Sequence, residues 1–290
     1  MAAARFLFLG TGTSAGIPMI GCSCPVCTSS DPRDSRTRTA AAVQWVDAGG
    51  RSRTVLIDAG PDLRTQALRA NLTRCDGIVV THNHVDHIFG LDEVRRFNAV
   101  MREPIDVWAD DHTMESLQRI YRHIFEKHNN VNDSFVATLV ARRISPEMVR
   151  GAAPITIHGA AFTPIPLLHG RLPVLGYRID IPLPAGVDRA AWPFPLAYCT
   201  DVSAFPPEAW PRLKGLRTLV LDALRDRSHP THLTLQQAVN IAGQVGAPRT
   251  YFIHMTHDLP HEETQARLPD GVSLAYDGLV LGEPVSTPAG

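Results

Sequence analysis

Three histidines and one aspartate lie within seven residues, in the pattern HxHxDH: His82, His84, Asp86 and His87. Imidazole and carboxylate groups that gather in a folded chain need strong partners, so this group does not suit an apolar core. Neutral imidazole and carboxylate are ligands for zinc, manganese and iron. Four ligands are more than one tetrahedral ion with an open position takes, so the stretch favours two adjacent ions. The alternative is a solvated, histidine-rich turn.

A second group of potential metal ligands consists of Cys22, Cys24 and Cys27. A structural zinc ion takes four ligands, so the fourth would have to come from a distant part of the chain. Two alternatives stay open, namely free buried thiols and a thioredoxin-like redox pair. The redox pair is the weaker alternative because residues 29–32, Ser-Ser-Asp-Pro, follow where that motif needs a helix.

Several later residues of the ligand type each follow a predicted strand. These residues are His82, His169, Asp201, Asp222 and His254. Loops at strand ends are common places for chemistry, because a rigid sheet positions them. A lone histidine is more often structural than a ligand, so His169 is a candidate only in the company of the others. His232 follows Asp222 across a loop and stands at the entrance to a predicted helix, 233–245.

Three other features allow more than one interpretation. Asp58 fits a turn residue or a partner that orients a ligand histidine. His229, in the loop before His232, is predicted to lie at the surface. The glycine-rich stretch 10–18 follows a strand, but no lysine and no helix pattern follow it, so it is not a phosphate-binding loop. Its glycines are expected to allow tight backbone turns near the site.

The composition is that of an ordinary globular protein. Of 290 residues, 44% are hydrophobic and 20% are charged, and the net charge of −1 gives no global basic field for nucleic acid or membrane. No stretch is long enough for a transmembrane helix, and the apolar run 6–9 is too short for a signal peptide. Five cysteines, three of them crowded together, argue against a disulfide framework. We therefore expect a reducing, cytoplasmic setting.

Strand-rich halves with interspersed helices predict an α+β protein built in layers. No linker interrupts the chain, so residues 1–290 are predicted to form a single domain. The spacing of apolar residues predicts a helix over 110–128, and the wider segment 110–144 is expected to be a helical insert or lid. Residues 274–281 suggest a terminal strand or hairpin, and residues 284–290 a frayed tail.

At this point the sequence resembles the metallo-β-lactamase fold superfamily, a four-layer αβ/βα sandwich with its metal site at one edge of the two sheets. The resemblance covers nearly the whole chain. It implies that His82, His84 and His169 hold one metal ion, that Asp86, His87 and His254 hold a second, and that Asp201 bridges them. Leu9 to Thr13 and Val174 to Ile179 resemble the phosphodiesterase branch, which includes tRNase Z.

The cysteine loop resembles a narrower group, the PhnP-type phosphoribosyl cyclic phosphate phosphodiesterases. That likeness implies a structural zinc ion on Cys22, Cys24, Cys27 and His257, which lies three residues after His254. His232-Leu233-Thr234 looks like the branch's HxT motif, whose histidine is catalytic, and Asp222 is expected to orient His232.

The resemblance predicts a phosphodiesterase with two divalent ions, zinc or manganese, whose bridging hydroxide attacks the phosphorus of a small phosphodiester, either cyclic or linear. Two alternatives are tRNA 3′-end processing and a biosynthetic role like that of the PqqB proteins. The near-zero net charge does not favour a nucleic-acid partner, and no membrane partner is expected. A homodimer is expected only because homodimers are common among soluble proteins.

Overall fold

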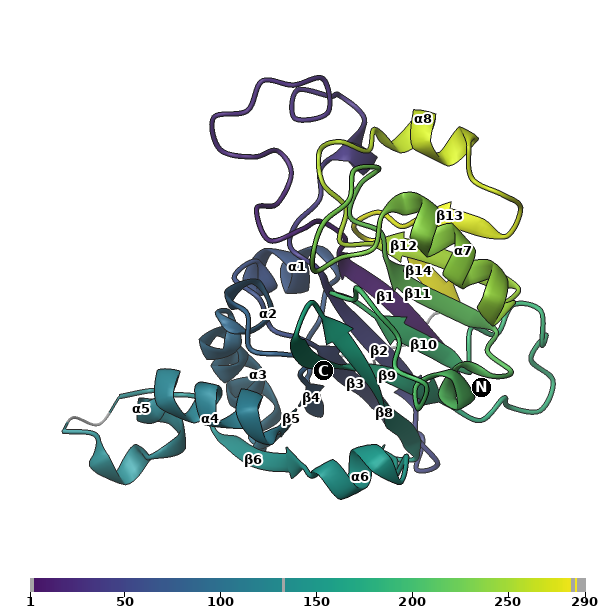
Figure 1. Ribbon diagram of the computed structural model, residues 1–290. Helices are drawn as coiled ribbons and strands as arrows, with labels where there is room; N and C mark the ends of the chain where they lie inside the picture. Colours follow the sequence, from purple (N-terminus) through teal and green to yellow (C-terminus); the bar gives the residue numbers. More distant parts are fainter. Residues whose placement is uncertain (1–2, 132–133, 283–284, 286–290) are drawn as a thin grey trace.

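The computed structural model describes residues 3–131, 134–282 and 285. Two seven-stranded mixed sheets pack face to face, and helices cover the outer face of each (Figure 1). The first sheet has the order β14 (Val280–Gly282), β1 (Ala4–Gly10), β2 (Ala40–Val46), β3 (Ser52–Ile57), β4 (Gly77–Val79), β5 (Ile105–Asp110) and β6 (Leu139–Ile144). The second has the order β13 (Val272–Leu274), β12 (Arg249–Ile253), β11 (Thr218–Asp222), β10 (Leu196–Cys199), β9 (Leu172–Asp180), β8 (Ala160–His169) and β7 (Ile155–Ile157).

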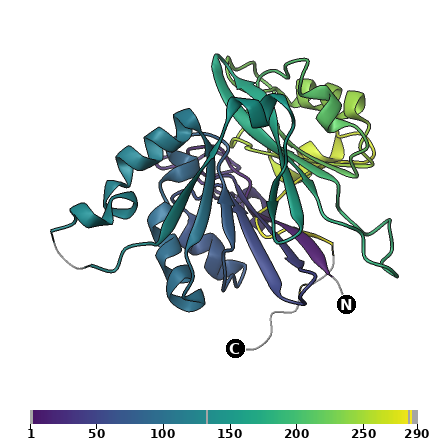
Figure 2. The ribbon, with the colours of Figure 1, turned by 90° about the horizontal axis from the view of Figure 1, so that it is seen from below.

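Apart from α6 (Pro146–Arg150), whose Met148 and Val149 pack against the core between the sheets, the helices fall into two groups, one on each sheet. No helix of the described residues is long and apolar enough to cross a membrane. The α-helices are α1 (Leu63–Arg69), α2 (Val85–Ile88), α3 (Arg95–Met101), α4 (Asp111–Ile120), α5 (Arg122–Phe125), α6 (Pro146–Arg150), α7 (Leu235–Val245) and α8 (His261–Ala266). The 3₁₀ turns are η1 (Pro32–Asp34), η2 (Leu91–Val94), η3 (Lys127–Asn129) and η4 (Trp210–Leu213). Figure 2 shows the blue helices that follow β3 to β5 on one side of the sheets and the yellow-green α7 and α8 on the other.

Strand β1 shows why the chain forms four layers. Successive side chains of a strand point to opposite faces, and β1 is apolar on both. Phe6 and Phe8 lie in the core between the sheets, whereas Leu7 and Leu9 lie in the core between the first sheet and its helices. A sheet that is buried on both faces needs cover on both, so the predicted αβ/βα sandwich is confirmed.

Parallel strands in each sheet bring the candidate residues together. β3 to β6 run parallel in the first sheet, and β10 to β13 run parallel in the second. Asp58 and His82 follow β3 and β4, while Asp201, Asp222 and His254 lie at the ends of β10, β11 and β12. The carboxyl ends of parallel strands share one edge of a sheet, which is where open α/β sheets usually bind ligands.

The structure differs from the sequence prediction in three segments. The segment 110–144, predicted as a helical insert, contains α4 and α5, but its last six residues form β6, because they pair along β5 as an additional parallel strand. Of the two alternatives predicted for residues 274–281, the structure has the terminal strand, β14, and not the hairpin, since β13 belongs to the second sheet and β14 to the first. The metal-ligand stretch is not all loop, because Val85–Ile88 forms the single turn α2. Of the predicted tail, only Val285 is among the described residues.

The glycine-rich stretch after β1 allows two backbone segments to approach each other closely. A Cβ on Gly10 would lie 2.0 Å from the carbonyl oxygen of Arg38, and one on Gly12 would lie 2.7 Å from that of Arg36. The glycines therefore let residues 10–12 lie against residues 36–38, where Gly12 N donates to Thr37 O.

Candidate metal centre

Two groups of ligand atoms meet at one carboxylate, that of Asp201. The first group is formed by His82, His84, His169 and Asp201, and the second by Asp86, His87, Asp201 and His254. Within each group, the ligand atoms lie within 4.8 Å of one another, and all of the residues except His84 are buried. The structure thus brings together all seven residues for which the sequence predicted metal binding, with Asp201 common to both groups.

Three imidazole Nε2 atoms at this centre lack hydrogen bonds. His87 Nε2 lies 3.2 Å from Asp201 Oδ2, and His254 Nε2 lies 3.2 Å from Asp201 Oδ1. These two atoms and His82 Nε2 are buried, yet none makes a hydrogen bond within the described chain. An unsatisfied buried polar atom costs about 1–3 kcal/mol, so three that converge on one carboxylate indicate a missing partner. Divalent ions fit this donor set of imidazole and carboxylate.

Outer hydrogen bonds fix which nitrogen of His87 and of His169 faces the centre. His87 Nδ1 lies 2.7 Å from Asp58 Oδ2, and His169 Nδ1 lies 2.8 Å from the carbonyl oxygen of Thr231. An Nδ1 that donates outward leaves Nε2 free as a ligand atom. Asp58 also accepts from Thr81 N and Oγ1, each at 2.8 Å. Of the two interpretations left open for Asp58, the contacts favour the partner that orients a ligand histidine.

Neighbouring charges decide the protonation of the buried centre, where burial opposes every charged form. Burial lowers the pKa of His82 well below its ordinary value. Burial also opposes charge on His87, but Asp201 and two further aspartates raise its pKa well above the ordinary value. Burial alone would raise the pKa of Asp201, yet His254 and His87 lower it well below the usual range. Asp201 therefore stays ionised, so its carboxylate is available as a ligand for cations.

Three residues of the centre occupy the left-handed backbone region. Asp58, Asp201 and His254 have φ angles of 65°, 51° and 61°. This conformation is uncommon for residues other than glycine and costs of order 1–3 kcal/mol where the surrounding structure imposes it. All three follow a strand or lie beside one at its carboxyl end, so the turn that ends each strand directs a carboxylate or imidazole into the centre.

His232 lies beside the two ligand groups, as the sequence predicted for a catalytic residue. Its ring centre lies 4.6 Å from that of His169 and 4.7 Å from that of His254. Asp222 is fully buried, and its Oδ2 lies 3.0 Å from His232 Nδ1, so Nε2 of His232 is the free nitrogen. Thr234 caps helix α7 and fixes the backbone just after His232. The catalytic roles of both residues stay predictions.

His229 is placed differently from the surface position that we predicted. It is half-buried, and its ring centre lies 5.1 Å from that of His232. Burial and the neighbouring His232 lower its pKa. The only signal in the sequence was its position three residues before His232, which on an irregular loop does not show which way a side chain points.

The cysteine loop and His257 form a separate four-ligand group. Sγ of Cys22, Cys24 and Cys27 lie 3.2, 3.4 and 3.5 Å from His257 Nδ1. A tetrahedral zinc ion with ordinary Zn–S and Zn–N bonds holds its sulfur and nitrogen ligands about 3.5 Å apart, so the residues fit such an ion. The backbone N–H of Cys27 lowers the pKa of the Cys24 thiol to about 7, which favours the thiolate.

Comparisons with known proteins agree with this geometry. Residues 53–255 match the family model of the beta-lactamase superfamily domain. The chain belongs to the metallo-β-lactamase superfamily. A crystal structure of a new diphosphatase from the PhnP family is 39% identical, covers 98% of each chain and superposes with a TM-score of 0.82, which places this chain in that family.

Of two further relatives, one is more distant in sequence and the other has a longer chain. Zinc-bound PqqB from Methylobacterium extorquens shares the fold at 18% identity, with a TM-score of 0.71 over 96% of this chain and 99% of that one. A protein named octanoyltransferase from Porphyromonas gingivalis is 35% identical over 95% of this chain, but the chain spans only 51% of that protein's length. The predicted superfamily and its PhnP-type branch are thus confirmed.

Proposed function

We propose that this protein is a metal-dependent phosphodiesterase that hydrolyses a small phosphodiester, either cyclic or linear. The observation that carries the proposal is the buried His232–Asp222 pair beside a centre for two ions. A thiolate leaves a thioester without a proton, whereas an alkoxide that leaves phosphorus needs one. The name diphosphatase of the PhnP-family relative also supports chemistry at phosphorus.

Residues of the chain divide the work at the centre. When bound, two divalent ions, zinc or manganese, would supply an activated water molecule and neutralise the charge of the phosphoryl oxygens. Asp201 would hold the two ions next to each other, and Asp58 would keep His87 oriented. His232 would donate a proton from Nε2 to the departing oxygen, and Asp222 would stabilise its imidazolium form. The cysteine loop would carry a structural zinc ion, since it has four protein ligands and no open position.

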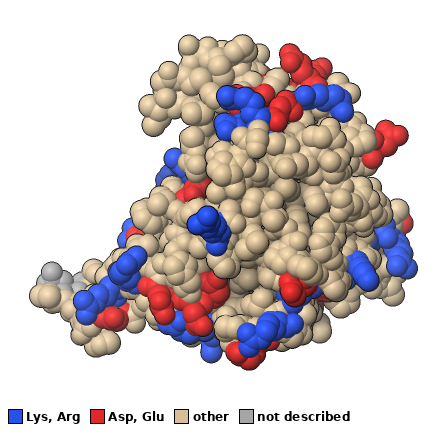
Figure 3. All heavy atoms as spheres, in the orientation of Figure 1, with Lys and Arg blue, Asp and Glu red and all other residues tan. Residues whose placement is uncertain are grey.

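Two alternatives have weaker support. RNA processing would favour a continuous basic surface, but on the face in Figure 3 the lysines and arginines are scattered and mixed with acidic side chains. A PqqB-like biosynthetic role rests on a likeness at 18% identity, which extends to the fold only. We therefore propose a small-molecule substrate and no nucleic-acid or membrane partner, while a homodimer and a cytoplasmic location stay predictions.

The proton donor separates this proposal from general metal-assisted hydrolysis. His232→Ala should lower kcat about 10²–10⁴-fold for a nucleoside 2′,3′-cyclic phosphate, whose leaving group is an alkoxide. The same variant should lose far less on bis-p-nitrophenyl phosphate, because p-nitrophenolate leaves without a proton. Metal content must match that of the wild-type protein. Equal losses on both esters, or none, would remove the role assigned to His232.

A further inference from the structure

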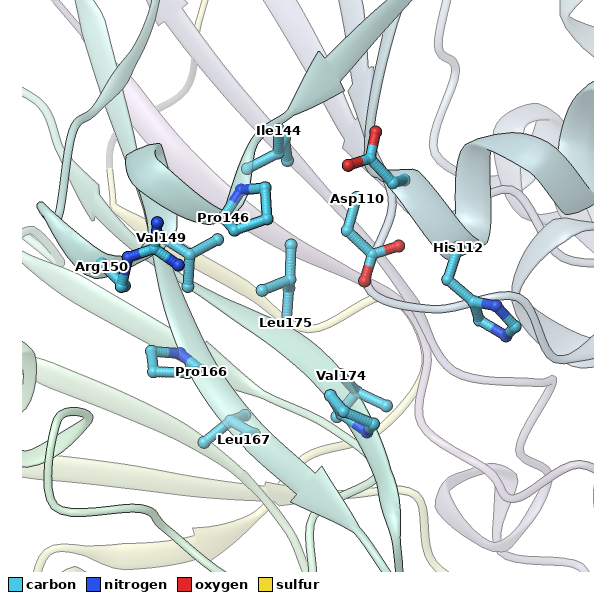
Figure 4. Close-up of a pocket in the computed structure, with 12 residues that line it drawn as sticks. Asp110, His112, Ile144, Pro146, Val149, Arg150, Pro166, Leu167, Val174 and Leu175 are labelled. Atoms are coloured by element: carbon cyan, nitrogen blue, oxygen red, sulfur yellow. The ribbon is translucent and has the colours of Figure 1, made fainter.

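A groove of about 340 Å³ opens between the β8–β9 hairpin and the segment formed by β6, α6 and the start of α4 (Figure 4). In Figure 4, side chains from both sides point into it, and His112 and Arg150 lie at opposite ends. Its walls are mostly aliphatic, and they include Ile144, Pro146, Val149, Pro166, Val174 and Leu175. Its volume falls at the lower end of the range for small-molecule sites.

The groove shares a sheet edge with the metal centre. Strands β4, β5 and β6 are parallel neighbours, and Asp110 at the end of β5 pairs with Ile144 at the end of β6. Thr81 occupies the corresponding place after β4, immediately before the ligand His82. Neighbouring strands lie about 4.8 Å apart, so the groove begins one to two strand spacings from the metal-ligand stretch.

Direct contacts connect the groove with the centre. Nδ2 of Asn83, which lies between His82 and His84 in the chain, is 3.2 Å from Nε2 of His112 at one end of the groove. On the other wall, Leu175 N donates to Thr81 O at 3.0 Å. His169 is the last residue of β8 in the same hairpin, and its ring centre lies 5.1 Å from that of His84. The groove thus adjoins the His84 side of the centre, and His169 separates that side from His232.

The chemistry of the lining favours an aliphatic occupant. Nucleobases are usually bound by aromatic stacking and by donors and acceptors for their edges, but the described lining holds no Phe, Tyr, Trp, Asn or Gln. The charged side chains already have partners. Asp110 accepts from Thr113 N at the start of α4, Asp111 pairs with Arg143, and Arg150 pairs with Glu147.

We infer that this groove holds an aliphatic ester group of the substrate, namely the group that His232 does not protonate. The inference rests on the proposed phosphodiesterase function and narrows its substrate class to phosphodiesters with an alkyl or acyl chain. The phosphate would lie at the two-metal centre, the leaving group toward His232, and the chain in the groove. Apolar surface removed from water then contributes to affinity in proportion to chain length.

The test measures binding first, with unreactive alkylphosphonates from methyl to hexyl titrated calorimetrically into the metal-loaded protein. Affinity should rise about fourfold with each added methylene. Val149→Trp, which fills the groove, and Val149→Asn, which adds a polar amide there, should both abolish the rise and leave methylphosphonate binding unchanged. Val100→Trp is the matched control, because Val100 is exposed on α3 and does not line the groove. Alkyl p-nitrophenyl phosphates supply the corresponding rates.

Each outcome decides one of the two claims. If affinity rises with chain length but no ester is hydrolysed, the groove assignment stands and the proposed function fails. If the esters are hydrolysed without any dependence on chain length, the function stands and the groove assignment fails. Equal weakening of all phosphonates by Val149→Asn, or tighter binding of thymidine monophosphate than of hexylphosphonate, would also overturn the aliphatic assignment.

Discussion

Replacing Asp58 by asparagine removes an acceptor that three buried donors share. Oδ1 accepts from Thr81 N, while Oδ2 accepts from Thr81 Oγ1 and His87 Nδ1. An asparagine has one oxygen and one NH₂ group, so in either orientation a donor faces a donor. Loss of the partner that orients a ligand histidine typically lowers metal affinity about 10–100-fold, which equals about 1.4–2.7 kcal/mol.

The assay is a competition titration of the metal-free protein with zinc and a chelator of known affinity. Asp58→Asn should lower the affinity for one zinc ion of the centre about 10–100-fold and leave the affinity of the cysteine site unchanged. Asp76→Asn is the matched control, because the Asp76 side chain is also buried and its Oδ1 lies 2.8 Å from Arg53 Nη1, but at the opposite edge of the same sheet. It should lower stability without changing zinc affinity. Wild-type affinity in Asp58→Asn would refute the account of how His87 is oriented.

Two other predictions concern parts of the fold outside the centre. Burial, with Arg33 and Arg36, lowers the pKa of His261 from 6.5 to about 4. The stability that this neutral imidazole contributes is present above about pH 6.5 and is lost as the pH falls to about 4, a change of about 3 kcal/mol. The free energy of unfolding would be measured by urea titration at a series of pH values. His261→Gln should reduce its fall at low pH, whereas the control His128→Gln, at an exposed residue, should not. If wild type and His261→Gln lose stability in parallel, His261 is not the cause of the fall. His257→Ala should remove one bound ion per chain and lower Tm, while the two ions of the centre stay bound; an unchanged metal count would show that the cysteine loop does not use His257.

Four residues that the structure brings together follow a simple rule in the sequence. His82, His169, Asp201 and His254 each come at the carboxyl end of a strand, and strand ends meet at a sheet edge. Apolar patterning fixes the strands, so the positions of these residues follow from it. The fourth ligand of the cysteine group could not be predicted by this rule, because nothing in the spacing of Cys22 to Cys27 indicates a residue 230 positions later. Only the resemblance to a known family supplied His257.

Features that depend on tertiary packing were missed. Residues 139–144 form β6 because β5 offers a free edge, and no local pattern in Leu-Val-Ala-Arg-Arg-Ile distinguishes this from the end of a helical insert. His229 was predicted at the surface, but it is half-buried beside His232. The conformation of its loop decides where this side chain points, and no local pattern in the sequence indicates that conformation. The two roles considered for Asp58 could be separated only by its contacts with Thr81 and His87.

Turnover during metal titration tests the central claim most directly. Metal-free protein would receive zinc or manganese in steps while bound ions are counted by mass spectrometry under native conditions. Hydrolysis of bis-p-nitrophenyl phosphate would be followed in the same samples. We predict that hydrolysis begins only when the second ion fills the centre around Asp201, with one further ion held by the cysteine site. Full turnover with one ion in the centre, or none with both in place, would contradict the account.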